Sequence, residues 1–151
     1  MGHKITKLGY DKLFEELNFL NNTKLPAIIK EVVIARALGD LSENAEYQSA
    51  KAEQRKCNSR IRYLSMILNN LNITPLPTDD SKIYFGSIVL LKDYEKDIER
   101  EFQIVCEYET EFYKNGLSAE SPLGKLLNGK EVGEIVQFRE KEYEVLKIKT
   151  I

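Results

Sequence analysis

Three carboxylates lie within seven residues near the end of the first third of the chain, at Asp40, Glu43 and Glu46. Acids at this spacing can hold a divalent cation, because Mg²⁺ takes oxygen ligands and often only one or two carboxylates from a protein. They can also start a helix, with Asp40 as the N-cap residue and Glu43 at the third helical position of a capping box. The spacing by itself favours capping and leaves a metal or catalytic role open.

Other kinds of catalytic site find little support in the sequence. The single histidine, His3, excludes a histidine-based triad or zinc site except at the start of the chain. The phosphate-binding patterns GxGxxG and GxxxxGK[ST] are both absent. Cys57 and Cys106 form no CxxC pair, and we expect both to pack as small apolar side chains.

The acids lie between two long apolar repeats that are typical of helices. Gly39 suits a helix C-terminus, and Asp40 or Ser42 suits a new N-terminus. Two long helices joined by so short a connection run antiparallel, so we predict an αα-hairpin with the acids at its tip. The second helix, of about thirty residues, would be roughly 45 Å long. The upstream repeat is Leu13, Leu17, Leu20, Ile28, Val32 and Ala35; the downstream one, with coiled-coil spacing, is Cys57, Ile61, Leu64, Leu68 and Leu71.

Pro26 lies inside the upstream repeat. Proline removes one helical hydrogen bond, and its ring clashes with the preceding turn. The sequence therefore predicts that the first helix kinks or splits there, and we favour a single kinked helix.

The second half of the chain has the composition of a small sheet. Residues 121–129 predict one short helix, with Ser121 as its cap, Pro122 at its first position and Gly129 after its end. The fold class predicted is α+β: an amino-terminal coiled-coil hairpin over 1–76, a linker over 77–82, and a small antiparallel sheet with one helix over 83–151. Alternating or β-branched runs predict strands over 86–92, 101–108, 134–138 and 143–149, with a tight turn that lacks glycine over 138–142.

Composition excludes several classes of protein. The chain has 151 residues, is 42% apolar and carries a net charge of −2, which suits one ordinary or two small domains with a packed core. Its apolar runs are too short for a membrane span. Its positive and negative charges nearly cancel, so the chain lacks the overall positive field with which proteins bind duplex DNA without sequence preference. We therefore expect a cytoplasmic protein with no membrane association. Residues 51–62 nevertheless form a local basic stripe with a net charge of +4.

Residues 36–54 read Arg-Ala-Leu-Gly-Asp-Leu-Ser-Glu-Asn-Ala-Glu-Tyr-Gln-Ser-Ala-Lys-Ala-Glu-Gln. This run resembles the signature of the bacterial Gre transcript-cleavage factors, which act in transcription elongation. Residues 121–130, Ser-Pro-Leu-Gly-Lys-Leu-Leu-Asn-Gly-Lys, resemble the family's second signature. The resemblance covers nearly the whole chain, and the modest basic stripe looks more like the GreA branch than the GreB branch.

The resemblance implies a fold and a function. The second domain would have an FK506-binding-protein-like fold and dock on bacterial RNA polymerase, while the hairpin enters the secondary channel of the polymerase. There the factor would stimulate Mg²⁺-dependent cleavage of the RNA 3′ end in backtracked complexes. Asp40 and Glu43 would help to hold Mg²⁺ and position the attacking water, only within the polymerase complex. The chain would be an accessory factor, not an enzyme, with no cofactor of its own and no small-molecule substrate.

Four further residues near the tip are candidates for contact with RNA or polymerase: Arg36, Tyr47, Lys51 and Arg55. Each also has a structural interpretation. Arg36 could neutralise the tip acids, Tyr47 could pack at the tip, and the two remaining cations, with Arg60 beyond them, could form an ordinary solvated helix face.

Two other functions stay open from the residues. A channel-binding inhibitor of the polymerase would share the fold without promoting cleavage, but it would not need acids at this spacing. A coiled-coil adaptor would carry a peptide-binding second domain, which should show a pocket lined by aromatic residues such as Phe102 and Phe138.

Overall fold

The computed structural model describes residues 2–40 and 43–150, and the chain folds as two compact units. A helical unit holds residues 11–70; a globular unit combines the segment up to Tyr10 with the chain from Leu71 on. In the part of the chain that the structure describes, no helix has the length and apolar character to cross a membrane.

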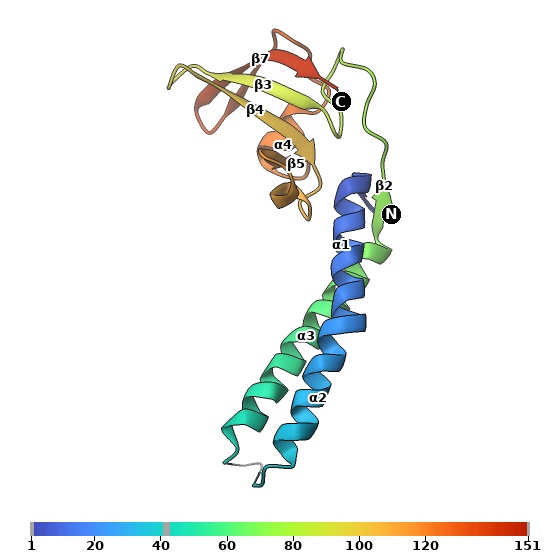
Figure 1. Cartoon of the computed structure of the whole chain (residues 1–151). Helices are drawn as coiled ribbons and strands as arrows, with labels where there is room; N and C mark the ends of the chain where they lie inside the picture. Colours follow the sequence, from blue (N-terminus) through green and yellow to red (C-terminus); the bar gives the residue numbers. More distant parts are fainter. Residues whose placement is uncertain (1, 41–42, 151) are drawn as a thin grey trace. The chain divides into compact units, whose positions relative to one another are not determined.

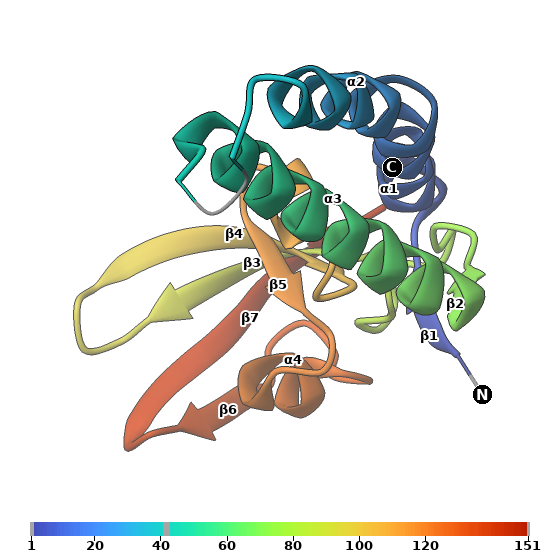
Figure 2. The same ribbon diagram turned by 90° about the horizontal axis from the view of Figure 1, so that it is seen from below.

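The helical unit is the predicted hairpin. Its first arm runs through α1 (Lys7–Phe19), a π-helical turn (Leu20–Lys24) and α2 (Leu25–Arg36), and its second arm is α3 (Ala45–Asn69). Figures 1 and 2 both show α2 and α3 side by side. The helices pack through the predicted repeats; their buried residues are Leu13, Leu20, Ile28, Val32, Ala35, Ala50, Cys57, Leu64, Ile67 and Leu68.

The second helix is shorter than predicted, with 25 residues. Its amino-terminal end is set by Asn44, and Asn70 leaves the helical conformation with φ −108°. Leu71, which continues the heptad spacing, therefore lies in a strand and not in the helix. The spacing of apolar residues indicates which side chains are buried. It does not show whether a buried residue at the end of the repeat, such as Leu71, belongs to the helix or to a strand that follows it.

The chain accommodates Pro26 by widening the turn before it. The Leu25 N–H donates to the carbonyl of Leu20, five residues back, so the backbone stays helical through a π turn. Pro26 then falls at the start of α2, where a missing N–H costs little. The first arm is thus helical from Lys7 to Arg36, with its regular bonding interrupted ahead of the proline.

The globular unit contains a five-stranded sheet in the order β5-β4-β3-β7-β6. Neighbouring strands are antiparallel except β5, which runs parallel to β4 and was not predicted. The predicted short helix is confirmed as α4 (Pro122–Leu127), with the Ser121 hydroxyl accepting from the Gly124 N–H at 3.1 Å. The strands are β3 (Ile88–Asp93), β4 (Ile98–Val105), β5 (Gly116–Ser118), β6 (Ile135–Phe138) and β7 (Lys141–Lys149).

One core joins the sheet to α4. Leu127 of α4 packs with Val89 and Val145 from the two central strands, and none of the three has exposed surface. Figure 2 shows α4 lying against the sheet. A loop with a 3₁₀ turn (Thr110–Phe112) connects β4 to β5.

The amino-terminal segment belongs to the globular unit. There β1 (His3–Ile5) pairs in parallel with β2 (Leu71–Ile73), and Thr6 follows directly. The Glu109 carboxylate, from the loop after β4, accepts hydrogen bonds from the Thr6 N–H at 3.0 Å and from the Thr6 hydroxyl. The Thr6 hydroxyl accepts in turn from the Gly9 N–H at 3.2 Å, so Glu109 supports the residue that directly precedes α1.

Candidate functional site

Asn44 organises the tip of the hairpin. Its side-chain oxygen accepts a hydrogen bond from the Tyr47 N–H at 3.0 Å, which caps α3, and its side-chain nitrogen donates to the Ala35 carbonyl of α2 at 2.6 Å. One side chain therefore ties the end of one helix to the start of the next. The sequence interpretation missed this role, although asparagine is among the preferred cap residues.

The capping role predicted for the acids is wrong. Because α3 begins at Ala45 after Asn44, Asp40 is not its N-cap and Glu43 is not in its first turn. The other predicted start, Ser42, lies outside the described residues. Glu46 alone of the three acids is in the helix, near its positive end, where a carboxylate is favourable.

The structure brings the three acids together around one open hollow of about 420 Å³. Asp40, Glu43 and Glu46 are all exposed there, and Leu38, Asn44 and Ala45 complete the lining. Carboxylate oxygens are ligands that Mg²⁺ accepts. Among the described residues, however, no three acids, histidines or cysteines lie close enough to hold a metal ion. A cation at this hollow would need further ligands from a partner.

Arg36 and Tyr47 contact each other across the tip. The guanidinium carbon of Arg36, the last residue of α2, lies 5.8 Å from the centre of the Tyr47 ring, within the range of a cation–π interaction. Tyr47 is half-buried and Arg36 is exposed. The pair thus packs the tip and leaves a guanidinium facing solvent.

The basic residues of α3 fall into two groups. Lys51 and Arg55 are four positions apart, so they share one side of the helix; Lys51 donates to Gln54 at 3.1 Å, and Arg55 is exposed. Arg60 instead makes two hydrogen bonds to Glu16 of α1, at 2.7 and 2.9 Å. That contact is the main cause of the lowered pKa of Glu16. Arg60 therefore joins α3 to α1, whereas Lys51 makes its hydrogen bond within α3.

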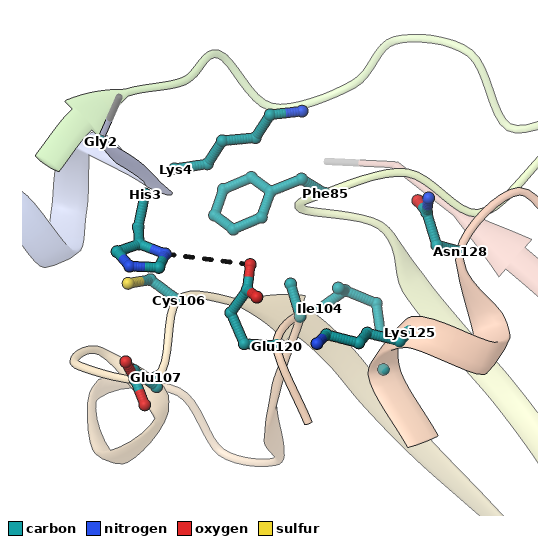
Figure 3. A pocket seen from close by; sticks show the side chains of 12 residues that line it. Gly2, His3, Lys4, Phe85, Ile104, Cys106, Glu107, Glu120, Lys125 and Asn128 are labelled. Atoms are coloured by element: carbon teal, nitrogen blue, oxygen red, sulfur yellow. Dashed lines mark ion pairs between the residues drawn. The ribbon is translucent and has the colours of Figure 1, made fainter. Parts of the chain in front are cut away.

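The globular unit has its own cavity, of about 370 Å³, shown in Figure 3. His3 and Lys4 of β1 face Lys125 and Asn128 from the region of α4, and the His3 Nδ1 lies 3.9 Å from a Glu120 carboxylate oxygen. Among the described residues that line it, Phe85 is the one Phe, Tyr or Trp side chain. Phe102, which the adaptor hypothesis placed in a peptide pocket, packs against the core and borders only a small hollow of about 80 Å³.

Comparisons with known proteins cover both halves of the chain. Residues 3–73 match the family model "Transcription elongation factor, N-terminal", and residues 78–150 match "Transcription elongation factor, GreA/GreB, C-term". The transcription elongation factor GreA of Chloroherpeton thalassium is 41% identical over 96% of this chain and 95% of its own. GreA of Paracoccus denitrificans is 37% identical, with 97% of each chain covered.

Among solved structures, the GreA factor homolog 1 (Gfh1) protein of Thermus thermophilus is 26% identical, covers 99% of each chain and has a TM-score of 0.46. The family resemblance inferred from the tip signature is thus confirmed by matches along the whole chain, and the relatives above carry the GreA name. This chain belongs to the GreA/GreB family of transcription elongation factors and is an accessory factor of the GreA type, not an enzyme in itself.

Proposed function

We propose that this factor binds bacterial RNA polymerase, inserts the hairpin tip into the secondary channel and stimulates cleavage of backtracked RNA. The observation that carries the proposal is the position of Asp40 and Glu43. Both are exposed at one hollow, and neither caps a helix because Asn44 performs that task. Both carboxylates are thus presented to whatever the tip enters.

The Mg²⁺ of the polymerase active site would supply the Lewis acid that stabilises the attacking and leaving oxygens at phosphorus. Asp40 and Glu43 contribute oxygen atoms that can bind a cation and accept a hydrogen bond from a water molecule. Asn44 joins the two helix ends between which Asp40 and Glu43 lie in the sequence. The remaining ligands come from the polymerase.

The basic face of the hairpin gives the RNA a path to the tip. Lys51 and Arg55 attract the phosphates of the extruded RNA, and the Arg36–Tyr47 pair offers a guanidinium and a ring edge near the 3′ end. These contacts are electrostatic, so they should weaken as salt increases. Such a role places the factor in the cytoplasm with its polymerase.

The test is a cleavage assay on halted, backtracked elongation complexes with Mg²⁺. Wild type should shorten the RNA, while Asp40→Asn and Glu43→Gln should each slow cleavage by about 100-fold, comparable to the loss of one charge-stabilising group in an enzyme. Glu15→Gln, a matched loss of one exposed carboxylate on α1, should leave cleavage unchanged. All variants should bind polymerase equally, since their shapes are retained.

Two results would overturn the proposal. Slower transcription without any RNA shortening would make the chain a channel-blocking inhibitor. Wild-type cleavage by Asp40→Asn would leave the acids without a role in the chemistry.

A further inference from the structure

A second hollow runs along one face of the hairpin, between α2 and α3, with a volume of about 450 Å³. We name it the acidic groove. Its rim carries Glu31 of α2 with Glu46 and Glu53 of α3, and its floor includes Ile34, Ser49 and Ala50. The groove shares Glu46 with the hollow at the tip, so one surface connects them.

The floor is open because small residues face a large one. Ile34 is 64% exposed, while α3 contributes the small side chains of Ala45, Ser49 and Ala50 to the floor and carries its two glutamates at the rim. A coiled coil ordinarily closes such a position with a larger side chain, since burial of apolar surface stabilises the folded chain. The hairpin forgoes that burial here and keeps an apolar surface accessible.

Charge is divided between the two sides of α3. Glu31, Glu46 and Glu53 make no ion pair with any Lys or Arg in the described chain, and no basic residue lines the acidic groove. Lys51 lies two positions from Glu53, about 200° around the helix. At the level of the acidic groove, the side of α3 that bears Lys51 is therefore basic, and the side that bears Glu46 and Glu53 is acidic over an apolar floor.

This combination selects one kind of partner. Nucleic acid is repelled, because unpaired carboxylates face its phosphates. A lysine or arginine fits, because its aliphatic stem can lie on Ile34 while its charged head reaches the rim. We propose that the acidic groove docks an arginine- or lysine-bearing polypeptide segment of the RNA polymerase, an inference that rests on the proposed function. The same contact confines the RNA to the opposite, basic face.

The substitution Ser49→Leu distinguishes a groove that binds the polymerase from a groove that only affects the stability of the hairpin. Leucine should fill the floor and raise the melting temperature of the hairpin by about 3 °C, since it buries apolar surface and favours a helix. It should at the same time weaken polymerase binding about tenfold. Ser59→Leu is the matched control, because Ser59 is exposed on α3 and lies outside the acidic groove. The control should keep wild-type affinity.

Charge reversal tests the rim. Glu31→Lys combined with Glu53→Lys should weaken polymerase binding about tenfold or more, and the deficit should shrink as salt increases. The cleavage rate at saturating factor should stay near wild type, because these residues lie away from Asp40 and Glu43. Glu15→Lys on α1 controls for a general change in charge.

A photo-reactive benzoylphenylalanine at position 49 identifies the occupant in the elongation complex. A cross-link to a basic polymerase peptide supports the proposal, whereas a cross-link to RNA or to a second copy of this chain overturns it. If wild type stimulates cleavage but the groove variants bind as tightly as wild type, this inference alone fails. If wild type neither binds polymerase nor changes its transcripts, the proposed function fails first.

Discussion

Glu109 has no exposed surface, yet the sequence marks it as an ordinary acid in a loop. Burying a carboxylate is costly unless it is hydrogen-bonded. Here the cost is offset by the Thr6 N–H and hydroxyl and by the Cys106 N–H at 2.9 Å. Gly9 completes the arrangement, because a methyl group at that position would overlap the Glu109 side chain.

Gly9→Ala should therefore destabilise the globular unit by about 2 kcal/mol, the typical cost of overpacking a buried site. The measurement is urea unfolding followed by circular dichroism. Leu8→Ala is the neighbouring control, and since the Leu8 side chain is 46% exposed its loss should cost much less. Equal stabilities for Gly9→Ala and wild type would contradict the close packing of Gly9 on Glu109.

Cys106 is a second residue whose chemistry follows from burial. Burial raises the pKa of its thiol, and the nearby Glu109 and Glu107 carboxylates raise it further. Since the thiolate is the reactive form, Cys106 should react with Ellman's reagent at pH 8 about 100-fold more slowly in the native chain than in urea. Raising the pH should accelerate labelling of the native protein. In a Cys57→Ser variant, where Cys106 is the remaining thiol, rapid native labelling at pH 8 would contradict the burial of Cys106.

Two secondary structure elements place unusual demands on the backbone. The π turn before Pro26 lets the first arm stay helical where the sequence alone predicted a kink or split. The hairpin between β6 and β7 turns at Arg139 and Glu140, both with positive φ, of 52° and 65°. Two-residue turns of this kind favour Asn-Gly, because side chains other than Gly and Asn are strained there.

Replacing Arg139→Asn together with Glu140→Gly should stabilise the globular unit by about 1 kcal/mol, because each strained position costs on that order. Differential scanning calorimetry measures the gain as a higher melting temperature. Glu142→Gly provides the contrast: Glu142 is in β7 opposite Gln137, where glycine weakens a strand. A lower melting temperature for the variant with the Asn-Gly turn would show that the Arg139 and Glu140 side chains stabilise the fold by more than the backbone strain destabilises it.

The Glu16–Arg60 contact joins α1 to α3 and should make the stability of the hairpin depend on pH. The Arg60 hydrogen bonds lower the pKa of Glu16 in the folded chain, so the stabilisation is present above the ordinary glutamate pKa. It is lost as pH falls through the lowered value. Glu16→Gln should cost about 0.5 kcal/mol at pH 7, the usual worth of an exposed pair.

The cost of the same substitution should shrink as pH falls below the ordinary glutamate pKa, and it should vanish once Glu16 is protonated in the folded as well as in the unfolded chain. Urea titrations at pH 7 and at a series of lower pH values provide the measurement. Glu15→Gln, which alters the adjacent exposed acid, should show no such difference. If Glu16→Gln still lowered the free energy of unfolding in acid, the loss would come from packing of the side chain and not from its charge.

The molecule as a whole consists of two units that are stabilised by different kinds of contact. The helical unit is stabilised by a repeat of buried side chains along two adjacent helices. The globular unit depends on contacts between the first ten residues and residues more than sixty positions later, such as His3 with Leu71 and Thr6 with Glu109. The first segment of the chain therefore contributes to the stability of the last domain.

A fragment of residues 71–151 should consequently be less stable than the same unit in the full chain. It lacks Thr6, which leaves the Glu109 carboxylate without two of its donors, and such a loss costs about 1–3 kcal/mol or more for a charged group. We expect its melting temperature to drop by at least about 5 °C. Equal melting temperatures would show that Glu109 finds other partners when the amino-terminal segment is removed.

Local sequence was sufficient for the features that depend on neighbours in the chain. Helical spacing from Leu13 to Ala35 and from Cys57 to Leu68 predicts the hairpin, because side chains three and four apart share one face. Ser121, Pro122 and Gly129 predict α4, because its capping bonds lie within four residues. The run from Arg36 to Gln54 identifies the family and the tip acids.

Tertiary structure decided the features that depend on distant residues. The parallel pairing of β5 with β4, the burial of Glu109 under Gly9, and the pairing of Arg60 with Glu16 each join positions that no local pattern connects. Asn44 became the cap because its side chain also reaches the Ala35 carbonyl across the tip. The acidic groove likewise exists only where Ile34 of α2 faces the small residues of α3. Which residues of two helices lie opposite each other is set by how the helices pack, and the spacing within either helix does not give it.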